Sequence, residues 1–246
     1  MQTITNEAYL RRRARLVWLL SIGGIAVMIA GAIRYYRGGG SVITPVALIV
    51  GGLVIGNIGL FLGRRWLRRP RPDEVLRDAL GELGRQYRLY NYTPPAPHLL
   101  ISPVGVYVLT VQRQYGRIVY NGKRWRRSRH WQQSILEMNF DRLGNPGQRA
   151  AKEVERVREF IARELPGQEV PVQAIIVFTH PRAEVEPAHT PMLVTHVDDL
   201  KTVLREATKE KSAGLRRRQR QQLEQILDSL AGQSRPAGSR AAKIRS

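Results

Sequence analysis

A run of arginines interleaved with tryptophans is the part of this chain whose residue types point most directly to chemistry. Residues 123–131 read KRWRRSRHW, so cations surround two indole rings. Arginines neutralise phosphates, and an exposed indole stacks on an unpaired base. The predicted nucleic-acid contacts, to DNA or RNA, are Lys123, Arg124, Arg126, Arg127, Arg129 and Trp131. Two alternatives stay open: a loop whose arginines are only solvated, and a patch that contacts anionic lipid headgroups.

Catalytic groups are sparse by comparison. The chain has no cysteine, which excludes disulfides, thiolate metal sites and cysteine nucleophiles. The sequence has no nucleophile triad, phosphate-binding glycine loop or metal-ligand spacing, so it predicts no metal and no cofactor. His98 and His130 are predicted to be surface or loop residues. Carboxylates available for a relocated metal site are Asp73, Glu74, Glu137 and Asp141, although solvated helix-face carboxylates are the simpler interpretation.

Charge and length limit the kinds of partner and the number of domains. The 246 residues include 40 Lys and Arg against 20 Asp and Glu, a formal charge of +20. Such an excess favours polyanionic partners, either nucleic acid or an anionic membrane surface. The length suits one membrane anchor and one soluble domain of about 100–200 residues.

Two uncharged apolar stretches, residues 16–33 and 42–62, predict a transmembrane hairpin. A helix needs about 20 apolar residues to span a bilayer, with roughly 17 as the lower limit. Basic residues gather on the cytoplasmic side of a span, so a multi-pass cell-membrane protein with both termini cytoplasmic is expected. The outer flanks carry Arg11, Arg12, Arg13, Arg15, Arg64, Arg65, Arg68, Arg69 and Arg71, whereas the connecting loop has Arg34 and Arg37.

Glycines spaced four residues apart in the second stretch predict close approach of another helix. The pairs are Gly52 with Gly56 and Gly59 with Gly63. The first stretch is the nearest candidate neighbour, and the pattern also permits a homo-oligomer. Asn57 is the only strongly polar side chain in either stretch, which indicates an interhelical hydrogen bond rather than an ion pathway.

The remaining pattern predicts an α/β domain over residues 72–207. Asp73 would cap a helix over 73–87, followed by an antiparallel meander that ends in RIVY. A helix over 148–164, a buried strand VQAIIVFT, a short strand MLVTHV and a closing helix follow. The predicted organisation is a basic segment 1–15, an anchor 16–63, a basic linker 64–71, the domain 72–207 and a basic, partly disordered tail 208–246. An amphipathic helix in the tail could lie on the membrane or pair with a partner.

The order of several short motifs in this domain resembles the nuclease-related domain (NERD) family, which has a restriction-endonuclease-like fold. The motifs are HLLISPVGVYVLTVQRQYGRI, a following tryptophan, Asn-Pro-x-Gln, IIVFT and Asp-Asp-Leu. The resemblance assigns structural positions to Gly105, Gly116, Trp125, Asn145, Pro146 and Gln148.

Three positions depart from the family pattern in a way that bears on catalysis. The family has an aspartate and a Glu-x-Lys pair where this chain has Pro97, Thr110 and Gln112. The carboxylates would hold a divalent cation, and the lysine would orient the attacking water. The resemblance therefore implies a catalytically degenerate domain with a nucleic-acid-binding or scaffolding role. The alternatives are an active Mg²⁺-dependent nuclease with a relocated site, and a membrane scaffold that binds a protein partner.

Overall fold

The computed structural model describes residues 1–38, 41–67, 69–120, 125–128, 143–186, 190, 192–209 and 214–233. The chain folds into two compact units. One unit is Glu7–Arg71, and the other joins Met1–Asn6 to the chain from Pro72 onward. The first six residues therefore belong with the later domain, although a helical hairpin separates them in the sequence.

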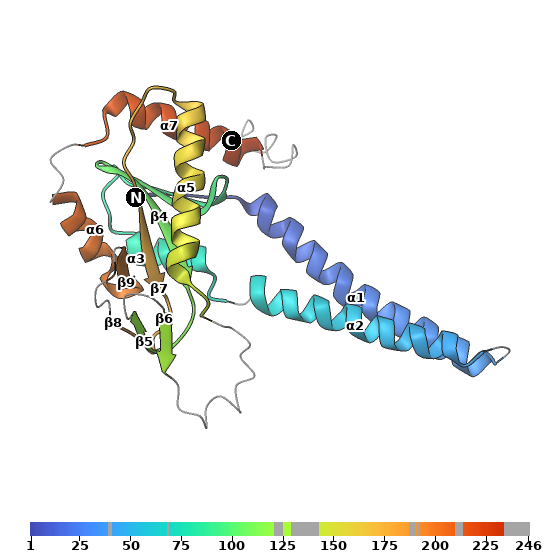
Figure 1. Ribbon diagram of the computed structural model, residues 1–246. Helices are drawn as coiled ribbons and strands as arrows, with labels where there is room; N and C mark the ends of the chain where they lie inside the picture. The colour runs from blue at the N-terminus through green and yellow to red at the C-terminus, as the bar shows by residue number, and fades with distance from the viewer. Residues whose placement is uncertain are drawn as a thin grey trace. The chain divides into compact units, whose positions relative to one another are not determined.

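Two long apolar helices form the smaller unit, as the sequence predicts (Figure 1). α1 spans Glu7–Arg37 and α2 spans Ile43–Trp66. Both are long and apolar enough to cross a bilayer. Each helix extends beyond its uncharged stretch, because the flanking arginines are good helix formers. Large apolar side chains such as Trp18, Leu19 and Phe61 are exposed on the pair, which suits helices surrounded by lipid.

Glycines bring α1 and α2 close together. A Cβ placed on Gly24 would lie 2.4 Å from the Gly56 nitrogen, and one on Gly52 would lie 2.6 Å from the Gly24 oxygen. A Cβ on Gly59 would lie 2.5 Å from the Ser21 Oγ. Helix backbones approach this closely only where side chains are absent. The prediction that these glycines admit the first helix is confirmed.

Alanine at Gly24 is expected to force the helices apart, whereas alanine at the adjacent Gly23 is not. The methyl group of Gly24→Ala would meet the α2 backbone, but nothing lies within 4 Å of the one at Gly23. Overpacking costs about 1–3 kcal/mol, while alanine at an open helix position is favourable. The measurement is the rate of disulfide formation between cysteines introduced at Val17 and Gly63, which pack together. Gly24→Ala should slow it about fivefold or more, and equal rates for both variants would contradict the packing.

A six-stranded mixed sheet is the centre of the larger unit, which confirms the predicted mixed α/β class (Figure 1). Its strand order is β1-β2-β3-β4-β7-β9. The pairs β2–β3 and β3–β4 are antiparallel, whereas β1–β2, β4–β7 and β7–β9 are parallel. The apolar strand β7 lies between two parallel neighbours, as expected of a strand buried on both faces. The strands are Gln2–Thr5 (β1), Arg88–Thr93 (β2), Ala96–Ser102 (β3), Gly105–Gln112 (β4), Val172–Phe178 (β7) and Leu193–His196 (β9).

A second, three-stranded sheet contains the segment predicted to complete the meander. β5 (Gly116–Tyr120) pairs antiparallel with β6 (Trp125–Ser128) and parallel with β8 (Ala183–Glu186). The prediction that RIVY extends the β3–β4 hairpin is therefore wrong. Gly116 has a φ of +90° and donates its N–H to the Arg182 carbonyl at 2.8 Å. Because glycine adopts positive φ freely, the chain turns here into another sheet.

Helices pack on both faces of the large sheet (Figure 1). The helices are α3 (Pro72–Leu80), α5 (Pro146–Glu164), α6 (Leu200–Lys209) after the 3-10 turn η1 (Val197–Asp199), and α7 (Arg217–Gln233). Alternate residues of β4 point to opposite faces. Val106 and Val108 share an apolar cluster with α5 and α7, whereas Tyr107 and Leu109 share one with α3 and α6. We call these the α5 face and the α3 face.

The opening helix is shorter than the predicted 73–87. α3 ends at Leu80, and Gly81 begins the turns that follow, since glycine is about 1 kcal/mol less favourable than alanine inside a helix. Asp73 lies within the first turn instead of capping it from outside. Its carboxylate accepts a hydrogen bond from the Tyr92 hydroxyl at 3.0 Å. The predicted cap is therefore a contact between α3 and the sheet.

Residues Gln2–Thr5 form an edge strand that the sequence pattern does not predict. β1 pairs parallel with β2, from Gln2 opposite Arg88 to Thr5 opposite Asn91. The Asn6 N–H extends this pairing by donating to the Asn91 carbonyl at 3.0 Å. Four residues are too few to carry a periodic signal, so the sequence indicates only a basic segment here.

The C-terminal helix lies where an amphipathic helix is predicted, but its apolar side is already covered. On the α5 face, Leu223 and Leu227 of α7 are 2% and 1% exposed. The Tyr90 hydroxyl donates to Asp228 at 2.8 Å, and Arg88 pairs with the same carboxylate at 3.0 Å. The prediction that this helix offers its apolar side to a membrane or a partner is therefore wrong. Residues 234–246 of the predicted tail lie outside the described residues.

Candidate functional site

Pro97, Thr110 and Gln112, the positions at which the resemblance implies catalytic residues, lie on the adjacent strands β3 and β4. Leu99 of β3 is opposite Val108 of β4, so Pro97 and Thr110, two residues further along, continue the same register. Thr110 and Gln112 both point to the α5 face and are each 2% exposed, whereas Pro97 is exposed. None of the three side chains carries a negative charge.

A buried glutamate of α5, Glu153, contacts Thr110. The Thr110 hydroxyl donates to the Glu153 Oε2 at 2.7 Å, and Glu153 is only 6% exposed. Burial raises the pKa of Glu153, while the Thr110 hydroxyl and then Arg149 and Arg156 act in the opposite direction. The side chain is thus a carboxyl group held in an apolar setting by one hydroxyl.

Glu153 is not among the site residues predicted from the sequence. Its position among the apolar residues of the predicted helix nevertheless indicates a buried charged side chain. It follows Ala150 by three residues and precedes Val157 by four, and both of these are buried on the inner side of α5. A charged residue in an apolar stripe is rarely buried without a partner or a function. Periodicity alone does not reveal which strand residue the carboxylate meets.

Gln112 completes the group with an amide. Its Nε2 is buried and makes no hydrogen bond to the residues that the structure describes. Its backbone carbonyl accepts from the Thr179 N–H at 2.9 Å and from the Thr179 hydroxyl at 3.2 Å. The site therefore offers one carboxyl, one hydroxyl and one amide. Divalent cations in nucleases need at least a pair of carboxylates, so this set does not fit Mg²⁺.

The carboxylates proposed for a relocated site do not join this group within the described part of the chain. Asp73 and Glu74 are on α3, which packs against the α3 face, whereas Glu153 comes from the opposite face. Glu137 and Asp141 lie outside the described residues, as does His130. Over the described ranges, no three His, Cys, Asp or Glu side chains form a group that could hold a metal ion.

His98 is buried in the sheet, so its prediction as a surface or loop residue is wrong. Its Nδ1 lies 2.8 Å from the Asn91 Oδ1, and the Asn91 Nδ2 donates to the Thr5 hydroxyl at 3.3 Å. The Tyr92 ring stacks edge-on against the imidazole, with 5.2 Å between centroids. Burial lowers the pKa of His98 to about 4. This chain of polar side chains ties β1 to β2 and β3.

The predicted nucleic-acid segment is described only at β6. Arg126 is exposed, and Arg127 pairs through its backbone with Ile118. Trp125 packs against Tyr120 and Phe178, with ring centroids 5.0 and 6.3 Å away, which makes it part of the core. The other predicted contacts, Lys123, Arg124, Arg129 and Trp131, lie outside the described residues.

The family-motif positions take part in turns and caps. A Cβ on Gly105 would lie 2.6 Å from the Pro171 carbonyl oxygen, and its φ is +150°. The Asn145 side chain accepts the Gln148 N–H at 3.1 Å, so it caps α5 with Pro146 in the first turn. These contacts position α5, and through it Glu153, against β4.

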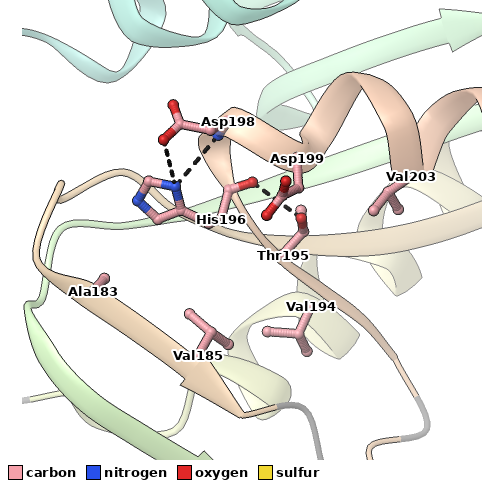
Figure 2. Close-up of a pocket in the computed structure, with 8 residues that line it drawn as sticks. All are labelled: Ala183, Val185, Val194, Thr195, His196, Asp198, Asp199 and Val203. Carbon is pink, nitrogen blue, oxygen red and sulfur yellow. Dashed lines mark hydrogen bonds and ion pairs between the residues drawn. The ribbon is translucent and has the colours of Figure 1, made fainter.

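A pocket of about 550 Å³ lies elsewhere in this unit, beside β8, β9 and the start of α6. Figure 2 shows apolar side chains on one side and polar ones on the other. The His196 Nδ1 is 3.1 Å from the Asp198 carboxylate, and the His196 Nε2 is 3.0 Å from the His180 carbonyl oxygen. Among the residues that the structure describes, no lysine or arginine lines this pocket, so the described lining does not suit a phosphate group. The lining residues are Ala183, Val185, Val194, Thr195, His196, Asp198, Asp199 and Val203.

Comparison with known proteins agrees with the predicted resemblance. The family model described as nuclease-related domain (NERD) matches residues 66–179. This range contains β2 to β7, α3 and α5, and therefore the whole Thr110–Gln112–Glu153 group. Searches of curated proteins and of solved structures gave no significant match. Residues 66–179, which hold four strands of the large sheet and the α5 helix capped by Asn145, therefore match the nuclease-related domain family.

Proposed function

We propose that this chain is a membrane-anchored nuclease-related protein that no longer catalyses metal-dependent hydrolysis and binds nucleic acid through phosphate contacts. The membrane anchor would be the α1–α2 hairpin. The binding surface would be the basic segment that includes β6. The proposed role is therefore to hold nucleic acid at the cytoplasmic side of the membrane.

The observation that supports loss of catalysis is the contact between Thr110 and Glu153. The resemblance places the family's carboxylates at Pro97 and Thr110, and among the described residues the carboxylate that contacts Thr110 is Glu153, which accepts a hydrogen bond from this neutral hydroxyl. A single carboxylate whose pKa is raised by burial does not offset the cost of removing water from a divalent ion. The burial of Glu153 and the hydrogen bond that it accepts from Thr110 support a structural role for this carboxyl group.

The charge distribution on β5 and β6 supports nucleic-acid binding. Arg117 of β5 forms a bidentate ion pair with Glu186 at 2.8 and 3.1 Å. This pair largely neutralises its charge, so Arg117 is a poor phosphate contact. Arg126 is exposed, and the neighbouring positions 123, 124, 127 and 129 are all basic. Phosphate contacts need such clustered and solvated cations. Trp125 is partly buried against the apolar core, so Trp131 is the aromatic residue that we propose for base stacking.

The pairing of β1 with β2 supports the proposed topology. Residues 1–6 precede the helix pair and residues from 72 follow it, yet both belong to one compact unit. A single unit built from both flanking segments supports a hairpin whose two ends lie on the same side of the bilayer, with an even number of crossings. The arginines that flank α1 and α2 favour the cytoplasmic side for both ends.

Glu153 also gives the alternative of a relocated nuclease site a specific form. In that case a second carboxylate, such as Glu137 or Asp141, would have to join Glu153 near Thr110. The remaining alternative is a scaffold that binds a protein partner, with arginines that contact anionic lipid headgroups. A combined binding and cleavage experiment separates the nucleic-acid-binding, nuclease and scaffold functions.

The full chain in neutral-lipid nanodiscs is expected to bind labelled oligonucleotides without cleaving them in Mg²⁺. Fluorescence anisotropy over a salt series should show affinity that falls steeply as salt rises. Replacing Arg124, Arg126 and Arg127 by alanine should reduce the slope of log K against log salt by about 3, since each lost duplex contact contributes about 0.9.

The matched control removes the same charge from the exposed start of α7, with Arg216, Arg217 and Arg218 replaced by alanine. Equal losses in both variants would mean that net charge, not the β6 segment, drives binding. Cleavage abolished by chelator and by Glu153→Gln would overturn the loss of catalysis. Absence of both binding and cleavage would favour the scaffold.

A further inference from the structure

The second helix carries one polar side chain at a depth where no water is expected. Asn57 lies seven residues before Arg64, the first charge after the apolar stretch of α2. At 1.5 Å per residue this is about 10 Å along the helix from that charge. In the proposed membrane anchor, the Asn57 amide is therefore surrounded by hydrocarbon at the height of the lipid tails.

Asn57 does not face α1, so it cannot make the interhelical hydrogen bond within the hairpin that the sequence suggests. The contact with α1 runs through Gly52 and Gly59, whereas Asn57 is exposed together with Leu53 and Leu60. An interhelical bond of this amide would therefore involve a helix outside the hairpin.

Most of the hydrogen-bonding capacity of this amide is unused among the described residues. The Asn57 Nδ2 donates to the Leu53 carbonyl of its own helix at 2.8 Å. The second Nδ2 hydrogen and the Oδ1 make no bond to any residue that the structure describes. Lipid tails supply neither donors nor acceptors, so leaving these atoms unpaired costs free energy.

The Asn57 amide thus has a free donor and a free acceptor. The same amide in a second copy of the chain offers the matching acceptor and donor. Copies of one chain cross the bilayer in the same direction, so their α2 helices are parallel. A two-fold axis along the bilayer normal brings the same residue of each copy together. The free N–H of each amide can then donate to the Oδ1 of the other, and the surrounding apolar side chains pack without charge repulsion.

We propose that α2 forms a parallel homodimer interface in the membrane, with Asn57 of each copy hydrogen-bonded to Asn57 of the other. The interface is the exposed face of α2 made by Leu53, Val54, Asn57, Leu60 and Phe61. The inference rests on the proposed membrane anchoring. It adds that the soluble domains, and with them any nucleic-acid contacts, are presented in pairs.

The test uses single cysteines in the full chain, which has none of its own. Leu53→Cys lies one turn from Asn57 on the same face and should give a disulfide-linked dimer when native membranes are oxidised. Ile55→Cys points about 200° away around the helix and serves as the matched control. Adding Asn57→Leu should reduce the cross-linked fraction at limiting expression about tenfold, whereas Asn57→Gln should retain most of it.

Each outcome supports one conclusion. Cross-linking at Leu53→Cys that is lost with Asn57→Leu and kept with Asn57→Gln supports the interface. Equal cross-linking at both cysteines, indifference to Asn57→Leu, or a link to a different protein would overturn it. Alkaline carbonate extraction is run alongside: a chain that leaves the membrane fraction refutes the anchoring itself, and a chain that stays there without dimerising refutes only this inference.

Discussion

Replacing both Leu223 and Leu227 of α7 by alanine should unfold the large sheet. Each side chain is at least 98% buried, in a cluster that includes Tyr90, Val108 and Phe178. Removing a buried leucine side chain down to alanine costs about 2–5 kcal/mol. Two such losses are comparable to the total stability of a domain, about 5–15 kcal/mol.

Hydrogen exchange of the full chain in detergent measures this effect directly. Amides of β7 are expected to be well protected in the natural sequence and to lose protection in the double variant. The control is Gln221→Ala with Gln225→Ala, since both glutamines are exposed on the other side of α7. If the double leucine variant kept its β7 protection, α7 would be a free amphipathic helix, as its sequence pattern alone suggests.

The polar contacts of α7 should matter less than its leucines. Arg88 is about four-fifths buried between Glu224 and Asp228, at 3.4 and 3.0 Å. Burial, followed by the bond to Asp228, raises the pKa of Tyr90, so this hydroxyl stays a neutral donor. Partly exposed ion pairs contribute about 1 kcal/mol or less. They fix the position of the helix, and apolar burial supplies the stability.

Acidification from pH 7 to pH 4 should destabilise the sheet unit through His98. Burial lowers the pKa of this imidazole to about 4, while an unfolded histidine titrates near 6.5. Between these values the unfolded chain binds the extra proton and the folded chain does not. Stability is therefore full above about pH 6.5, falls as the pH falls, and levels off below about pH 4. The total loss is on the order of 3 kcal/mol.

The measurement is the urea midpoint of the full chain in detergent at half-unit pH steps, compared between the natural sequence and His98→Gln. The difference between the two curves isolates His98 from groups such as Glu153, whose raised pKa acts in the opposite direction because its folded form keeps the proton. His98→Gln should have the flatter curve below pH 6.5. Parallel curves would show that the pKa of the His98 imidazole is not lowered in the folded protein and that the ring is solvated.

The structure links this pH response to the start of the chain. His98 contacts Asn91, Asn91 donates to Thr5, and the Asn6 side chain donates to the Tyr92 carbonyl at 3.1 Å. A second proton, on Nε2, would keep the Nδ1–H donation to Asn91 but place a positive charge in a buried setting. Exchange protection of residues 2–5 is therefore expected to fall before that of β7 as the pH decreases.

The sequence by itself determined the features that depend on neighbouring residues. Long uncharged runs determined α1 and α2, helical spacing after Asn145 determined α5, and continuous apolar residues determined β7. Motif order predicted the resemblance to the nuclease-related domain, which the family match over residues 66–179 confirms. Each of these signals is carried by local periodicity, charge or spacing, so it can be read without knowing the partner segments.

Tertiary structure alone decided which distant segments meet. Pairing of Gln2–Thr5 with β2, the move of RIVY into a second sheet and the burial of Leu223 and Leu227 all join residues far apart in the chain. The same holds for Glu153, whose hydroxyl partner Thr110 is 43 residues away. Likewise, only the packing of Gly52 and Gly59 against α1 left Asn57 facing outward. A pattern along one segment gives the side that is apolar, whereas the contact that covers it depends on the whole fold.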